Sequence, residues 1–141
     1  MSQIFFDTYQ FVYLLKDTGT RGAEVADLLE RMEERGDGLA TSMLTLGELL
    51  VKPVEKGELA LANQFETVLR RSGIRLVPFD IGAATAYARI RADRSIRAPD
   101  AIQLACAASA GCDVFVTNDS SLTKKKVDGI QFIVTPDRVP I

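Results

Sequence analysis

The amino-acid sequence predicts an α/β protein: a single-domain three-layer α/β/α sandwich with a central parallel sheet. Short apolar runs alternate along the chain with longer segments of helical periodicity, and this alternation is typical of a parallel sheet buried between two helix layers. The 141 residues also amount to one ordinary domain, without an internal repeat or a linker. We therefore expect one domain over residues 1–141.

The first half of the chain begins with a short apolar run that ends at an acid and continues in apolar residues spaced too closely for a strand. An amphipathic segment then stops at Gly36, and a later helix can be capped by Thr41 or Ser42 and should end before Pro53. The expected elements are strand 3–6, a helix around 12–15, helix 23–35, strand 38–41 and helix 42–51.

The second half continues the same alternation. Glycines stop two of its helical segments, and Pro99 suits the first turn of another helix. The expected elements are helix 58–71, strand 74–79, helix 80–94, a helix from Pro99 to Ala110, strand 113–117 and strand 131–134.

Composition limits the possible functions. Apolar residues make up 47% and charged residues 26% of the chain, values that fit a globular protein and exclude a disordered one. The longest weakly polar run, 98–111, falls short of the roughly 20 residues that span a bilayer. The first residues also lack the basic leader of a secretory signal. We expect a cytoplasmic protein without a membrane segment.

The chain contains no histidine and only two cysteines, Cys106 and Cys112. Hydrolases that depend on histidine and zinc sites with four nitrogen or sulfur ligands are therefore excluded. We expect the two cysteines to be buried thiols. Catalysis would have to use carboxylates with metal ions, an activated lysine, or a serine or threonine with an unusual base.

Four acids are candidates for such chemistry. Asp7 and Asp119 follow predicted strands, and the carboxyl ends of parallel strands are where ligands bind in open sheets. Either acid could instead cap a helix. Asp100 suits the positive end of its helix dipole, and Glu48 could pair with Lys52 on a helix surface. Each acid alone is explained structurally.

Together the acids fall into a pattern that resembles the PIN domain, specifically the ribonuclease toxins of VapBC toxin-antitoxin systems. The matching segments are Ile-Phe-Phe-Asp7-Thr8, Thr41-Ser42-x-x-Thr45-x-x-Glu48-Leu49, Ala98-Pro99-Asp100-Ala101-Ile102-x-Leu104-Ala105-x-Ala107 and Val116-Thr117-Asn118-Asp119. They occur in the right order over residues 4–119. Any one segment would be weak evidence, but four in order are specific.

The resemblance implies a metal-dependent endoribonuclease in which Asp7, Glu48, Asp100 and Asp119 converge and hold Mg²⁺ or Mn²⁺. Carboxylate oxygens suit these hard ions. It also implies polar roles for Thr8, Thr117 and Asn118. The implied partners are an RNA substrate, a small antitoxin and a second copy in a homodimer. Two residues depart from the family pattern: Tyr9 replaces a small or amide residue, and Ser121 stands where many relatives have another acid.

The formal net charge is −2, so any RNA contact must be local. Residues 89–126 carry seven basic side chains against four acidic ones, and we predict that these seven contact RNA phosphates. They are Arg89, Arg91, Arg94, Arg97, Lys124, Lys125 and Lys126. Alternatively, these charges only solvate helix faces.

Three other functions remain open. A non-catalytic PIN-like module would bind RNA or protein without cutting, and a purely structural subunit would not respond to metal. A phosphoacceptor receiver domain expects paired acids after its first strand, but this chain has the single Asp7 there.

Overall fold

The computed structural model describes residues 1–16, 19–71 and 73–141. Its sheet consists of β1 (Gln3–Phe6), β2 (Gly38–Ser42), β3 (Ile74–Val77), β4 (Val114–Val116) and β5 (Phe132–Val134). The helices are α1 (Thr8–Lys16), α2 (Thr20–Arg35), α3 (Met43–Glu55), α4 (Leu59–Leu69), α5 (Ile81–Ile90), α6 (Ala98–Ser109), α7 (Ser120–Thr123) and the 3-10 turn η1 (Pro136–Arg138).

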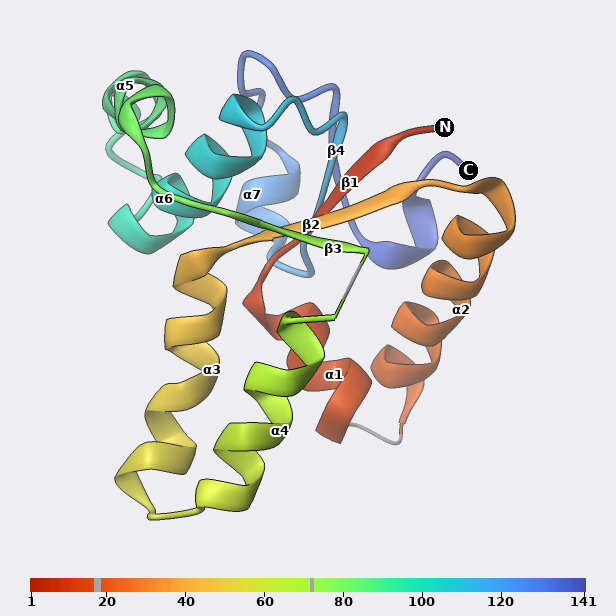
Figure 1. Ribbon diagram of the computed structural model, residues 1–141. Helices are drawn as coiled ribbons and strands as arrows, with labels where there is room; N and C mark the ends of the chain where they lie inside the picture. The colour runs from red at the N-terminus through yellow and green to blue at the C-terminus, as the bar shows by residue number, and fades with distance from the viewer. Residues whose placement is uncertain (17–18, 72) are drawn as a thin grey trace.

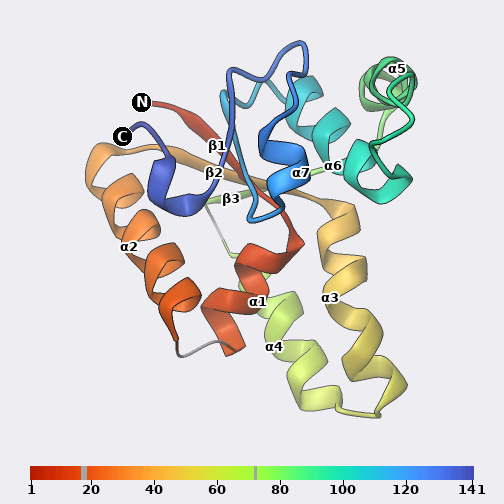
Figure 2. The same ribbon diagram turned by 180° about the vertical axis from the view of Figure 1, so that it is seen from behind.

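The strands pair in the order β3-β2-β1-β4-β5, and each of these pairs is parallel. Figure 1 shows α5, α6 and α7 on one side of the sheet and α1 to α4 on the other, and the reverse view in Figure 2 agrees. The predicted three-layer sandwich with a parallel sheet is therefore confirmed.

Two apolar clusters hold the layers together. Phe5 of β1 and Phe115 of β4 point to the side of α5 and α6, and their rings stack with centroids 5.3 Å apart. Ile4 and Phe6 point to the opposite side, where they pack with residues of α1 to α4. The alternation follows from the period of two in a strand, so both faces of these central strands are apolar.

Several predicted boundaries are wrong. Helix α3 continues through Pro53 to Glu55, because a proline in the last turn removes only one backbone donor and the next turn closes with Lys56 N–H donating to the Lys52 carbonyl at 3.1 Å. Strand β3 ends at Val77 instead of 79, directly before Pro78, which has no N–H for the sheet.

Helix α5 ends at Ile90 and not at Arg94. Asp93 accepts hydrogen bonds from the backbone N–H and the hydroxyl of Ser95, at 3.0 and 2.6 Å, and Arg91 donates to the Ile96 carbonyl at 2.6 Å. Such local side-chain bonds compete with the helix. The short elements α7 and η1 were not predicted. Ser72, part of an expected helix stop, lies outside the described residues.

The expected helix ends at two positions are confirmed. Ser42 caps α3 by accepting from the Thr45 N–H at 3.3 Å, and Gly36 follows α2 with a φ of 75°, which favours glycine. Both cysteines are free and buried, as expected, and burial raises the pKa of each thiol to about 11. Across the described ranges, no helix is long and apolar enough to cross a bilayer.

Candidate active site

The strand order reverses between β1 and β4, because β2 and β3 extend the sheet from one side and β5 from the other. Ligands of open α/β sheets bind outside the carboxyl ends of the strands at such a reversal. Asp7 directly follows β1, and its backbone N–H donates to the Val116 carbonyl of β4 at 3.2 Å. Asp119 follows β4 by three residues. The topology therefore brings these two acids to one edge.

Two adjoining hollows lie at this edge. The larger, of about 660 Å³, is lined by Asp7, Glu48 and Asp100 among others, and the smaller, of about 230 Å³, by Asp7, Asp100 and Asp119. We call the two hollows together the acidic cleft. All four predicted acids line it, although the first and the last of them are more than a hundred residues apart in the sequence.

Asp7 is the most deeply placed of these acids. The pKa of its carboxyl is raised from 3.8 to about 6, mainly by burial and in smaller part by the charge of Asp100. Hydrogen bonds from Thr117 and from Gln10 lower this pKa but do not cancel the effect of burial. The Gln10 side-chain amide donates to Asp7 Oδ1 at 3.2 Å and to Asn118 Oδ1 at 3.3 Å. The ionised form of Asp7 is therefore disfavoured, because its carboxylate is largely removed from water.

Asp100 lies in the first turn of α6, as predicted. Burial raises the pKa of its carboxyl, and Asp119 and Glu48 raise it further by charge repulsion. Arg97 opposes this rise, because its guanidinium Nε lies 3.4 Å from Asp100 Oδ2. These mutual effects mean that the acids of the cleft interact electrostatically.

Asp119 caps the short helix α7, which is the alternative structural role expected for this acid from the sequence. Its Oδ1 accepts from the backbone N–H of Ser121 at 2.9 Å and from the hydroxyl of Ser121 at 2.6 Å. The hydroxyl bond is the main reason that the pKa of Asp119 is lowered, and Arg97 contributes. Asp119 is therefore stably ionised at neutral pH, and Ser121 contacts the acid that it follows.

Glu48 does not pair with Lys52 among the described ion pairs. It accepts instead from the Thr8 hydroxyl at 2.6 Å and from the side-chain amide of Gln103 at 3.3 Å. Gln103 is buried and also donates to Thr8 and Thr45 at 3.1 and 2.9 Å. Hydrogen bonds from Thr8 and Gln103 therefore hold the Glu48 carboxylate at the cleft.

Sequence reasoning missed Gln10 and Gln103, which position acids. Each stands three residues after an acid of the cleft: Gln103 follows Asp100 within α6, and Gln10 follows Asp7, which directly precedes α1. That spacing was an available signal. The three predicted supporting residues do contact the site: Thr8 donates to Glu48, Thr117 bonds to Asp7, and Asn118 accepts from Gln10.

Within 1–16, 19–71 and 73–141, no three acidic or cysteine side chains are grouped closely enough to cage a metal ion. The chemistry of the cleft nevertheless fits a divalent cation. Mg²⁺ usually takes only one or two carboxylates directly and keeps its other waters. Asp7 and Asp100 offer two hard oxygen ligands, and burial raises the pKa of both carboxyls.

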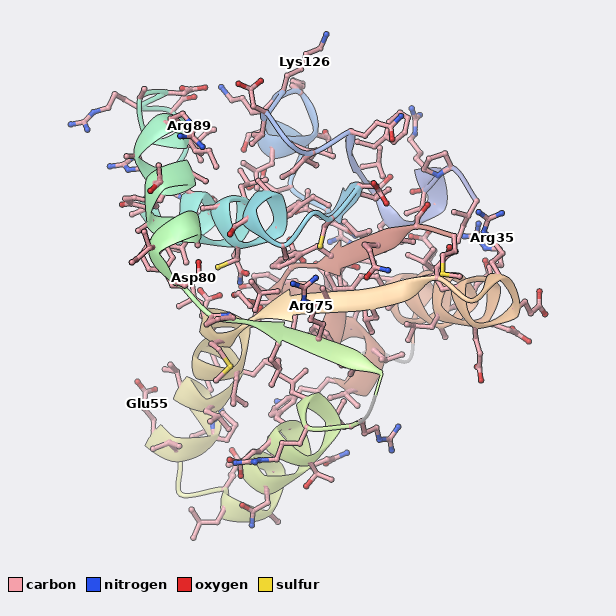
Figure 3. The ribbon with its side chains drawn as sticks, turned by 45° about the horizontal axis from the view of Figure 1, so that its top comes forward. Arg35, Glu55, Arg75, Asp80, Arg89 and Lys126 are labelled. Atoms are coloured by element: carbon pink, nitrogen blue, oxygen red, sulfur yellow. The ribbon has the colours of Figure 1, made fainter. Side chains whose placement is uncertain are left out.

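The seven predicted RNA contacts do not all lie at the acidic cleft. Of these seven, only Arg97 lines the acidic cleft. Arg89 and Lys126 line a separate hollow of about 550 Å³, and Figure 3 shows both at the end of the molecule away from Glu55. Lys125 bonds to Asp93 at 3.0 Å, and Arg91 bonds to the Ile96 carbonyl at 2.6 Å. Arg94 and Lys124 are exposed.

The fold and the cleft define a single-domain α/β protein with four acids at the reversal of a parallel sheet. The sequence model of the PIN domain matches residues 4–128, and the chain belongs to the PIN domain family. No curated protein matches the sequence significantly.

Several solved structures of toxins or toxin-antitoxin complexes have this fold. VapBC2 from Rickettsia felis, bound to a promoter DNA fragment, has a TM-score of 0.74 at 17% identity, with 94% of this chain and 96% of that chain covered. A toxin-antitoxin complex from Klebsiella pneumoniae has a TM-score of 0.67 at 21% identity, covering 94% and 97%. VapC20 from Mycobacterium tuberculosis, described as a toxin that cleaves the sarcin-ricin loop, has a TM-score of 0.64 at 16% identity, covering 87% and 96%.

Proposed function

We propose that this protein is a metal-dependent endoribonuclease and the toxin of a VapBC-type pair. The observation that carries the proposal is the acidic cleft, where four carboxylates from separate segments meet at the sheet reversal. The raised pKa values of Asp7 and Asp100 support it, because a dipositive ion would relieve the repulsion that causes part of each rise. The fold shared with toxin structures supports the toxin role.

In this proposal Asp7 and Asp100 bind Mg²⁺ or Mn²⁺, and Glu48 and Asp119 complete the site through waters or after small side-chain rotations. A divalent ion bound there would activate water and neutralise charge on the phosphate. Gln10 and Gln103 orient Asp7 and Glu48, and Thr8, Thr117 and Asn118 hold the polar frame. Ionised Asp119 adds negative charge that favours the cation.

The test is to map the ends of RNA cut by the purified protein in Mn²⁺. Hydrolysis should leave a 5′-phosphate and a 3′-hydroxyl. Chelator and Asp100→Asn should abolish cutting, whereas Asp93→Asn, an exposed acid outside the cleft, should not. Ends with a 2′,3′-cyclic phosphate, or full activity in chelator, would contradict the proposal. RNA binding without cutting in Mn²⁺ would favour the non-catalytic PIN-like module.

The toxin role has its own test. We propose that a small antitoxin covers the cleft and places a basic side chain among the acids, that the toxin acts in the cytoplasm, and that it forms a homodimer. Expression alone should arrest growth, and co-expression with the neighbouring gene product should restore it. Harmless expression without a copurifying partner would refute the toxin role and leave the nuclease proposal intact. A monomer at micromolar concentration would refute the dimer.

A further inference from the structure

Tyr9 is an exposed aromatic side chain at the rim of the acidic cleft. It is 62% exposed, follows Asp7 and Thr8 in the first turn of α1, and lines both hollows. A single exposed aromatic residue is common and means little alone. Its position beside the acids and the groups next to it indicate a binding role.

A second ring and a cation stand beside Tyr9. The ring of Tyr13, one turn further along α1, has its centroid 6.0 Å from that of Tyr9. The guanidinium of Arg21, from α2, lies 5.3 Å from the Tyr13 ring centroid and donates to its hydroxyl at 2.7 Å. All three side chains line the smaller hollow together with Asp7 and Asp119.

Arg21 has no carboxylate partner among the described ion pairs. Its guanidinium is held in place by Tyr13, so it is oriented but its charge is not neutralised. An oriented, unneutralised guanidinium beside a cleft suits a phosphate oxygen. The rim of the cleft therefore combines an exposed aromatic ring with a cation that can bind a phosphate.

Single-stranded RNA is recognised by this combination, because unpaired bases stack on tyrosine rings while basic side chains follow the phosphates. We propose that Tyr9, Tyr13 and Arg21 form a nucleotide subsite. The base of an unpaired nucleotide next to the scissile phosphate stacks on Tyr9, Tyr13 supports the ring and the guanidinium, and Arg21 binds the neighbouring phosphate. The term scissile rests on the proposed function; the stacking does not.

Tyr9 lies beside the acids of the cleft but carries no carboxylate. In this proposal Tyr9 contributes to binding the RNA, separately from the acids that would cut it.

The experiment measures binding of fluorescein-labelled, mixed-sequence single-stranded RNA by anisotropy, with metal-free protein in chelator so that no cutting occurs. Tyr9→Ala and Tyr9→Leu should weaken binding by about 5- to 150-fold, the range for loss of one stacked base. Tyr9→Phe should bind as the wild type does. Phe79→Ala removes an aromatic residue that is 47% exposed and lies outside the cleft, and should change nothing.

A series of oligonucleotides with one abasic position each locates the stacked base. At one position the abasic RNA should bind wild type weakly, and Tyr9→Ala should cause no further loss with that RNA. The chain has no tryptophan and three tyrosines, so RNA binding should also quench tyrosine emission, and less so in Tyr9→Phe. Arg21→Gln should lower the salt slope of binding by about 0.7 units, the value for one phosphate contact to a single strand.

Equal binding by wild type and Tyr9→Ala, or no binding of single-stranded RNA by wild type at low salt, would overturn the subsite. Unchanged RNA binding with weakened binding of a copurified protein would assign Tyr9 to a protein contact instead. A protein that shows the Tyr9 effect but never cuts RNA in Mn²⁺ would refute the nuclease and keep the subsite. A protein that cuts RNA but shows no effect of Tyr9→Ala on binding would refute the subsite and keep the nuclease.

Discussion

The guanidinium of Arg97 lies 3.4 Å from the carboxylate of Asp100, so the acidic cleft contains a cation of its own. The same guanidinium helps to lower the pKa of Asp119. Because the Arg97 side chain is 79% exposed, water and salt weaken this pair. A divalent ion entering the cleft would compete with Arg97 for Asp100, and Arg97 would then be free for a phosphate.

We predict that Arg97→Gln binds Mn²⁺ more tightly than wild type in the absence of RNA. An exposed pair contributes up to about 1 kcal/mol, so the gain should be at most about fivefold. Isothermal titration would measure it. Arg94→Gln is the matched control, because Arg94 is exposed and does not line the cleft. Equal or weaker Mn²⁺ binding by Arg97→Gln would mean that the two cations do not compete.

We predict that Asp7→Asn stabilises the metal-free protein at pH 7. Its folded-state pKa of about 6 lies above the ordinary value of 3.8, so the folded protein holds the proton more tightly. Stability is therefore lost as pH rises from about 4 through 6, by up to about 3 kcal/mol. Melting curves from pH 4 to 8 should show the variant gaining over wild type across this range. If Asp7 were only a helix cap, the variant would be neutral or weaker.

Asp93→Asn should act in the opposite direction and serves as the contrast. The hydroxyl of Ser95 and the ammonium of Lys125 lower the pKa of Asp93 to about 2. The ionised carboxylate therefore stabilises the folded state at pH values above its unfolded-state pKa, and this stabilisation is lost as the pH falls toward 2. Adding Mn²⁺ should raise the melting temperature of wild type and of Asp93→Asn, but not that of Asp7→Asn. An unchanged metal response in Asp7→Asn would argue against Asp7 as a ligand.

We predict that Gln103→Ala destabilises the protein and loosens Glu48. The Gln103 side chain accepts from the buried Ser42 hydroxyl at 2.6 Å and donates to Thr45 at 2.9 Å, so its loss leaves buried polar groups unpaired at a cost of about 1–3 kcal/mol. Urea unfolding measures this cost. Gln131→Ala, at an exposed glutamine, should stay within about 0.5 kcal/mol of wild type. A loss no larger than the control's would mean that the network rearranges freely.

The hollow that Arg89 and Lys126 line gives a fourth prediction. If RNA crosses this hollow, replacing both residues by glutamine should lower the salt slope of binding to single-stranded RNA by about 1.4 units. Cut positions should not change, because phosphate contacts carry no base information. An unchanged slope would assign these charges to solvated helix surface, the alternative for this segment.

The apolar runs predicted the strands well, because both faces of a buried parallel strand must be apolar. Boundaries set by single contacts were less accessible. The end of α5 depends on Asp93 bonding to Ser95 and on Arg91 donating to the Ile96 carbonyl. Helical periodicity does not predict such bonds. Pro53 shows the converse, since a residue that usually stops a helix is accepted in the last turn of α3, where its ring is buried.

By itself the sequence determined the α/β class and the absence of histidine chemistry, because both follow from residue type and spacing. The resemblance to the PIN domain singled out the four acids. Their role as metal ligands stays a prediction. Only the tertiary structure decided that these acids share one cleft, that Asp7 is buried enough to have a pKa of about 6, and that Arg97 pairs with Asp100. The physical reason is that desolvation and charge interactions depend on distances between side chains far apart in the chain, and the reversal of the strand order sets those distances.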